Sequence, residues 1–124
     1  MTLTLTILAV ILTASAADAA RRFPTSAAAL AWRAPAWWLS QAACIYRHES
    51  AGFGWHIDHR DYLGRKSAYS GGMQFLDSTW RAAGGIGRAA LWSPREQQYR
   101  AYVVWERDGG SWREWGTRSQ CRLR

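Results

Sequence analysis

The sequence predicts a small α+β domain that is mainly helical, with a short β-hairpin lobe and one disulfide. Residues 36–50 and 94–107 carry apolar side chains at helical spacing, whereas residues 53–70 are polar and interrupted by glycine. The chain also has an even pair of cysteines. With 124 residues and 48% hydrophobic content it is long enough for one domain with a modest core, and its nine tryptophans argue against disorder.

Residues 1–19 are typical of a secretory signal. Leu3 to Leu12 is an apolar run too short to span a bilayer comfortably, and small residues follow it, with cleavage positions after Ala16 or Ala19. Because no Lys or Arg precedes this run, a retained N-terminal anchor stays open as the alternative. Either arrangement predicts a domain that works outside the cytoplasm.

An alanine-rich connector, residues 20–35, separates the signal from the main domain at residues 36–124. Pro24 and Pro35 lie near its ends and interrupt any long helical pattern. We expect a linker or a short frayed helix that carries no chemistry.

The first helix of the domain ends in Glu49, the carboxylate best suited to chemistry. Its apolar stripe leads there through Trp38, Ala42 and Ile45. Gly52 and Gly54 follow and are expected to stop the helix. The partner-free carbonyls of a last helical turn disfavour a charged carboxylate, and burial beside tryptophans would add to this. Both effects would raise the pKa of Glu49, as a general acid near neutral pH requires. A solvated glutamate at a helix end is the alternative.

The segment after this helix is polar and predicts short hairpin strands or an irregular loop. Asp58 and Asp61 are its only carboxylates, and both are expected to be solvated or to form turns. A general acid such as Glu49 could protonate the leaving oxygen of a glycosidic bond. An enzyme that hydrolyses such a bond also needs a second carboxylate as nucleophile or base, and neither aspartate stands out as one.

A glycine-rich turn, Gly71-Gly72-Met73-Gln74, is the second candidate part of the site. Glycine permits positive φ and close backbone approach to a sugar, and the Gln74 amide offers a donor and an acceptor. A plain hairpin turn followed by a core Phe75 stays open. Asp77 is expected to cap a short helix through Ala83, with Thr79 and Trp80 in its first turn.

The clearest helix start in the chain is the capping box Ser93-Pro94-Arg95-Glu96. The spacing puts Gln98 on the broad apolar face of the helix that follows, and Glu96 on the other face with Arg100 and Arg107. A buried Gln98 would need a hydrogen-bond partner, so a structural bond and a role in the cleft both stay open.

Cys44 and Cys121 are the only cysteines, and in an exported protein they are most simply a disulfide, with two free thiols as the alternative. The long loop would contribute roughly 4 kcal/mol in the chain-entropy model. No metal or other cofactor is expected, because the second histidine that a zinc-protease helix needs after His48 is replaced by Gly52.

The net charge of +7 suits an anionic polymer, and by itself it fits a cell wall, a nucleic acid or an anionic membrane. The basic residues are dispersed rather than gathered in a stripe, so a nucleic-acid-binding or membrane-active protein is the most distant hypothesis.

Several sequence blocks, in order, resemble the transglycosylase-like domain of resuscitation-promoting factors, small relatives of lysozymes and lytic transglycosylases that act on peptidoglycan. The blocks are Cys44 to Gly52, Tyr69 to Phe75, Ser78-Thr79-Trp80, Arg95 to Gln98, and Trp112 with Trp115. The resemblance covers about Trp37 to Cys121. Here the first cysteine lies one helical turn earlier than in many members, and Leu76 stands where many have aspartate.

The resemblance implies a lysozyme-like fold, the Cys44–Cys121 bridge, and cleavage of the β-1,4 bond between muramyl and glucosaminyl residues. Glu49 would act as acid and then as base. The residues that the resemblance places at the glycan are Tyr69, Gln74, Thr79, Trp80 and Gln98. Hydrolysis by water, as in a muramidase, and a non-catalytic wall-binding or signalling module are the alternatives.

The expected partner is the peptidoglycan glycan strand, with a wall endopeptidase as a candidate second partner. No nucleic acid and no stable membrane partner beyond an N-terminal anchor are expected. The domain is expected to be a wall-associated monomer.

Overall fold

The computed structural model describes residues 22–51 and 53–124, so the expected signal or anchor at residues 1–19 lies outside the described part. The elements, in order, are α2 (Ala27–Ala31), α3 (Ala36–Ser50), β1 (Tyr69–Ser70), β2 (Phe75–Leu76), α4 (Asp77–Ala82), η1 (Ala89–Leu91), α5 (Pro94–Arg107) and η2 (Gly116–Ser119). Within the described ranges, every helix falls short of the length and apolar content that a membrane crossing requires.

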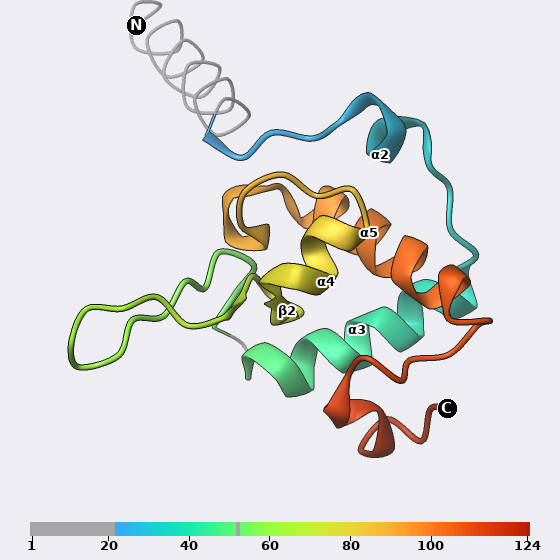
Figure 1. Cartoon of the computed structure of the whole chain (residues 1–124). Helices are drawn as coiled ribbons and strands as arrows, with labels where there is room; N and C mark the ends of the chain where they lie inside the picture. Colours follow the sequence, from blue (N-terminus) through green and yellow to red (C-terminus); the bar gives the residue numbers. More distant parts are fainter. Residues whose placement is uncertain (1–21, 52) are drawn as a thin grey trace, which may run out of the picture.

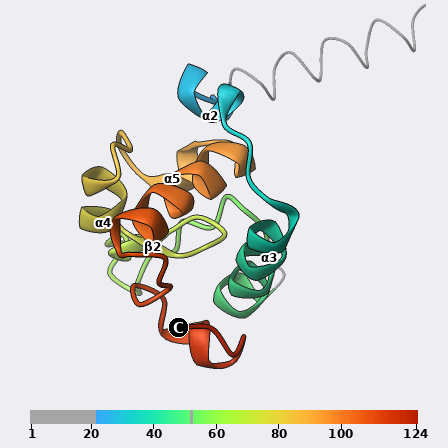
Figure 2. The ribbon, with the colours of Figure 1, turned by 90° about the vertical axis from the view of Figure 1, so that its right-hand side faces the viewer.

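These elements form a mainly helical α+β domain of lysozyme-like type, as predicted. Figures 1 and 2 show α3 on one side of the molecule and α4 and α5 on the other, with the C-terminal segment beside α3. A cluster of aromatic side chains fills the space between them. Its largest fully buried members are Trp38, Trp80, Trp112 and Phe75.

Helix α3 is confirmed with the predicted bounds. Trp38, Ala42 and Ile45 are buried along one stripe, because the 3.6-residue period brings them to the same face. The helix ends at Ser50, where Ala51 adopts a left-handed conformation with φ of 48° and donates its N–H to the carbonyl of Arg47. Glu49 therefore lies in the last turn, as the sequence predicts.

The predicted faces of α5 need a correction at their polar positions. Ser93 caps the helix and Pro94 starts it, as expected, but Glu96 and Gln97 are the buried polar residues and Gln98 is only half-buried. The Glu96 carboxylate accepts the backbone N–H of Ser26 at 2.7 Å and the Arg100 guanidinium at 2.9 Å. These partners satisfy the charge that burial would otherwise disfavour.

The expected linker supplies the cover over this carboxylate. Residues 22–35 contain α2, which starts from a Ser26 cap and packs against α5. Ala29 is fully buried, and its carbonyl accepts the Nε of Arg95 at 2.7 Å. The short, alanine-rich helix α2 thus covers the N-terminal half of α5.

The hairpin lobe, defined here as residues 53–76, extends from the helical body (Figure 1). Its strands pair antiparallel, Tyr69 with Leu76 and Ser70 with Phe75, around the glycine-rich turn. Residues 53–68 form a long loop in which the one described backbone bridge joins Arg60 and Lys66. The two structures predicted from the sequence, hairpin strands and an irregular loop, are therefore both present.

Arg88 ties this lobe to α4. Its guanidinium pairs with Asp58 at 2.6 Å and with Asp77 at 2.7 Å, and it donates to the carbonyl of Ser67 at 2.8 Å. The expectation that Asp77 caps α4 is wrong, because Leu76 takes the N-cap position and the Asp77 carboxylate turns to Arg88. Asp58 is likewise part of an ion-pair cluster rather than solvated.

Gln97 joins three separate segments. Its Oε1 accepts the N–H of Gly72 at 2.9 Å, and its Nε2 donates to the carbonyls of Trp55 at 2.9 Å and Trp92 at 3.0 Å. A Cβ on Gly71 would lie 2.4 Å from the same Oε1, so the turn can approach only as glycine. This amide therefore sets the position of the hairpin turn against α5.

We expect Gln97→Leu to lower the free energy of unfolding by about 3 kcal/mol or more, because it leaves three backbone groups without their partner. Urea denaturation measures this change. The matched control is Gln98→Leu, which changes the half-buried neighbouring amide and should cost much less. Equal losses in the two variants would contradict this role of Gln97.

Candidate active site

A pocket of about 210 Å³ lies where the hairpin lobe, α4 and the C-terminal segment meet. Its lining residues are Tyr69, Gln74, Phe75, Leu76, Thr79, Glu114 and Trp115. Tyr69, Gln74 and Thr79, each predicted from the sequence resemblance, therefore share one wall of one pocket. Phenol, amide and hydroxyl groups beside apolar rings are the lining that a sugar-binding pocket requires.

The glycine-rich turn presents Gln74 to this pocket. Gln74 itself has a left-handed backbone with φ of 48°, a conformation that non-glycine residues adopt rarely and that clusters at functional sites. Its Nε2 donates to the carbonyl of Gly71 at 2.8 Å, which fixes the amide. The Oε1 atom thereby stays oriented as an acceptor for an N–H or O–H group.

The floor of the pocket is held by Trp115. Its indole Nε1 donates to the carbonyl of Met73 at 2.9 Å, and its ring packs edge-on against Phe75 at 5.5 Å between centroids. One hydrogen bond thus fastens the C-terminal segment to the hairpin turn. This bond holds together the hairpin turn and the C-terminal segment, which both line the pocket.

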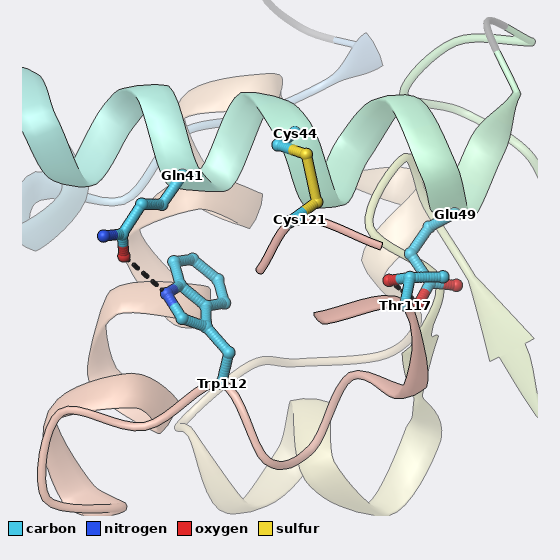
Figure 3. Close-up of a disulfide and its surroundings, with 6 residues drawn as sticks. All are labelled: Gln41, Cys44, Glu49, Trp112, Thr117 and Cys121. Carbon is cyan, nitrogen blue, oxygen red and sulfur yellow. Dashed lines mark hydrogen bonds between the residues drawn. A yellow bond between two sulfur atoms is a disulfide. The ribbon is translucent and has the colours of Figure 1, made fainter. Parts of the chain in front are cut away.

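Glu49 lies outside the lining of the pocket proper, and the stretch from Trp115 to Thr117 connects the two. The Thr117 hydroxyl donates to Glu49 Oε1 at 2.8 Å (Figure 3). Thr117 follows Trp115 by two positions, so the C-terminal segment contributes both the residue that holds the acid and a residue that lines the pocket.

The environment raises the pKa of Glu49 above its ordinary value, as the sequence predicts. Desolvation of the half-buried carboxyl is the largest cause, and the hydrogen bonds from the Thr117 side chain and backbone oppose it. The last turn of α3 adds the negative end of its dipole. Glu49 is therefore biased towards the protonated form that can donate a proton.

Two other predicted substrate residues are placed elsewhere. Trp80 is fully buried, packs against Phe75 with 5.2 Å between ring centroids, and donates its Nε1 to the carbonyl of Ile86. Gln98 is half-buried on α5 and does not line the pocket. Trp80 supports the pocket wall through Phe75, whereas substrate contact by Gln98 stays a prediction.

The sequence pattern gave no indication of Glu114 or Thr117. Both lie in a segment without regular periodicity, and Thr117 is separated from Glu49 by 68 positions. The one available signal was the cysteine pair, because Cys121 follows Thr117 by four residues and its bond to Cys44 brings this segment onto α3. A disulfide therefore carries positional information about the site.

Three side chains of metal-binding type lie together at the same disulfide. Cys44, His48 and Cys121 place one potential ligand atom each within 4.8 Å of the others. The two sulfurs are bonded to each other, so the histidine is the one remaining ligand of this group in the oxidised protein. The arrangement lacks the complete ligand set of a structural zinc site.

We expect Thr117→Val to raise the pKa of Glu49 further, because it removes a hydrogen bond that favours the carboxylate. Activity that requires the protonated acid falls as pH rises through this pKa, so the alkaline limb of the pH–rate profile should move to higher pH. Thr117→Ser keeps a hydroxyl and is the control. An unchanged limb in the valine variant would show that Thr117 does not tune the acid.

Comparison with known families identifies the domain that contains this site. A family model described as a transglycosylase-like domain matches residues 45–118, more than half of the chain, and this range includes Glu49, the pocket lining and Thr117. The chain matched no curated protein and no solved structure. The chain therefore belongs to the transglycosylase-like domain family, which at family level indicates an enzyme that cleaves the glycan of peptidoglycan.

Proposed function

We propose that the protein is a lytic transglycosylase that cleaves the β-1,4 bond between muramyl and glucosaminyl residues. The observation that carries this proposal is the desolvated Glu49, held by Thr117 next to a pocket of polar and aromatic side chains. A carboxyl group with a raised pKa is suited to protonate the leaving glycosidic oxygen. The family match supports peptidoglycan as the substrate class.

The reaction needs one acid used twice. Glu49 donates its proton to the bridging oxygen as the bond to the muramyl anomeric carbon breaks. The resulting carboxylate then accepts the proton of the muramyl 6-hydroxyl, whose oxygen closes on the anomeric carbon. The products are a glycan with a free 4-hydroxyl and a 1,6-anhydromuramyl end, and Glu49 is protonated again.

The pocket residues orient the sugar for this step. Gln74 Oε1 accepts an acetamide N–H or a hydroxyl, and the Thr79 hydroxyl and Tyr69 phenol offer further hydrogen bonds. Phe75 and Trp115 are almost fully buried and form the apolar part of the lining beside these polar groups. Such positioning accounts for a large part of an enzyme's rate enhancement.

Hydrolysis is the second candidate, and Glu114 favours it. This carboxylate lines the same pocket, so a second acid is present there even though neither aspartate of the hairpin lobe lines it. An inverting hydrolase uses its second carboxylate to activate a water molecule. Glu114 is solvent-exposed, whereas Glu49 is half-buried, and the transglycosylase with one acid is therefore preferred.

Product masses separate the two reactions. Purified peptidoglycan is digested in water enriched in ¹⁸O, and the released muropeptides are measured by mass spectrometry. The transglycosylase produces anhydro ends that lack one water and carry no label. Labelled reducing ends would instead assign the hydrolytic reaction to the site.

The disulfide and the family are consistent with work outside the cytoplasm, at the cell wall.

A further inference from the structure

A second pocket, distant from Glu49, has the composition of a binding site. It has a volume of about 270 Å³ and lies among the start of α3, the end of α5 and the last residues of the chain. We call it the tryptophan–arginine pocket, after the residues Trp37, Gln41, Trp105, Trp112, Arg122 and Arg124. The catalytic proposal uses none of these side chains.

The aromatic part of the pocket is an exposed platform on a rigid base. Trp37 is 54% exposed, and its ring lies against Trp105 with 5.8 Å between centroids. Gly110 allows this packing, since a Cβ there would lie 3.3 Å from the Trp105 ring. An exposed indole held in place by a second indole loses little freedom when it binds a ligand.

The amide of Gln41 lines the pocket and is held by one hydrogen bond. Its Oε1 accepts the indole N–H of the buried Trp112 at 2.8 Å (Figure 3). An indole nitrogen can only donate, so this bond fixes which end of the amide faces the protein. The amide NH₂ group is left as a donor, and it makes no hydrogen bond to the described residues.

The charged part of the pocket is formed by Arg122 and Arg124. Neither guanidinium forms an ion pair with a carboxylate in residues 22–51 and 53–124, whereas Arg88, Arg100 and Arg113 all do. Arg122 also has a positive φ of 55°, a strained conformation for a side chain of this size. Unpaired guanidinium groups beside a donor amide are complementary to a carboxylate or phosphate.

We propose that the tryptophan–arginine pocket binds a saccharide or polyol unit that carries a carboxylate or phosphate. The ring or chain lies on Trp37, the oxyanion pairs with Arg122 and Arg124, and the Gln41 amide donates to a hydroxyl or carbonyl oxygen. Trp37 precedes Glu49 by twelve residues on α3, or about 18 Å along the helix. The pocket is thus an accessory site for an anionic wall polymer, and its binding does not depend on the reaction at Glu49.

Titrations monitored by the indole N–H signals of a ¹⁵N-labelled protein test this proposal. The carboxylate probe is N-acetylmuramic acid and the phosphate probe is a short glycerol phosphate oligomer, so the two arms distinguish the sources of the anion. Neutral chitobiose is the uncharged comparison, and a single-stranded oligonucleotide represents the rival polyanion. We expect one of the two anionic probes to shift the Trp37 and Trp105 signals, with affinity that falls as salt is added.

The double variant Arg122→Gln/Arg124→Gln should weaken this binding at least about tenfold, since a hydrogen bond to a charged group contributes about 1.5–3 kcal/mol. Arg65→Gln/Arg81→Gln removes the same charge from two exposed arginines elsewhere and should retain the binding. Trp37→Ala should abolish it.

Three results would overturn the proposal. The first is unchanged Trp37 and Trp105 signals with both anionic probes, and the second is equal affinity in the two double variants. The third is tighter binding of chitobiose or the oligonucleotide than of either anionic probe, measured from the same two indole signals.

Discussion

Glu49→Gln is expected to lower the rate of peptidoglycan cleavage by about 10²–10⁴-fold, the usual contribution of a general acid or base. The amide matches the carboxyl in size and can still accept the Thr117 hydroxyl bond, so the pocket keeps its shape. It has no acidic proton to donate to the glycosidic oxygen. Release of soluble muropeptides from purified cell walls measures the change.

Glu106→Gln is the matched control, because it makes the same chemical change at an exposed position of α5. It should digest walls at the parental rate. Comparable activity in Glu49→Gln would remove the catalytic role and favour a wall-binding or signalling module.

The stability of Glu49→Gln should have a defined pH dependence. Because the folded state raises the pKa of Glu49, the stability that this carboxyl contributes is complete below its unfolded pKa. That stability is lost as pH rises through the folded pKa. Between acid and neutral pH, the wild type should therefore lose stability relative to the variant, which urea denaturation at several pH values can follow.

Loss of the disulfide is the second large effect expected. The bond joins α3 to the C-terminal segment across 77 positions, with its two Cα atoms 6.0 Å apart (Figure 3). Cys44→Ser/Cys121→Ser should lower the free energy of unfolding by about 4 kcal/mol in the chain-entropy model. Activity should fall as well, because this segment carries Trp115 and Thr117.

Denaturation with and without a reducing agent separates the effect of losing the disulfide from the effect of the serine substitutions. Reductant should lower the midpoint of the wild type to near that of the double serine variant and leave that variant unchanged. A wild-type midpoint that does not respond to reductant would contradict the stabilising role of the bond.

Local signals were sufficient for the main helices. The stripe of Trp38, Ala42 and Ile45 has the helical period, and Ser93 with Pro94 marks a helix start independently of the surroundings. The direction of the Glu49 pKa shift could also be predicted, but its largest cause is burial, which depends on residues far along the chain. The helix boundaries, in contrast, depend on neighbours along the chain.

Long-range packing decided the rest. Periodicity placed Glu96 on the polar face of its helix, but α2 covers this side chain. The backbone N–H of Ser26 donates to the Glu96 carboxylate, and Arg100 forms an ion pair with it. Asp77 is a residue type that commonly caps helices, but here it pairs with Arg88, which also binds Asp58 in the hairpin lobe. Each outcome depends on a partner far along the chain, which local propensity does not specify.

The proton affinity of Glu49 in the folded protein tests the account most directly. A ¹³C titration of glutamate side-chain carboxyls, assigned by the signal missing in Glu49→Gln, measures its midpoint. We predict a pKa above the ordinary glutamate value of 4.5, and a higher one still in Thr117→Val. A midpoint at or below 4.5 would mean that the folded protein does not raise the pKa of Glu49, and the proposed acid would be lost.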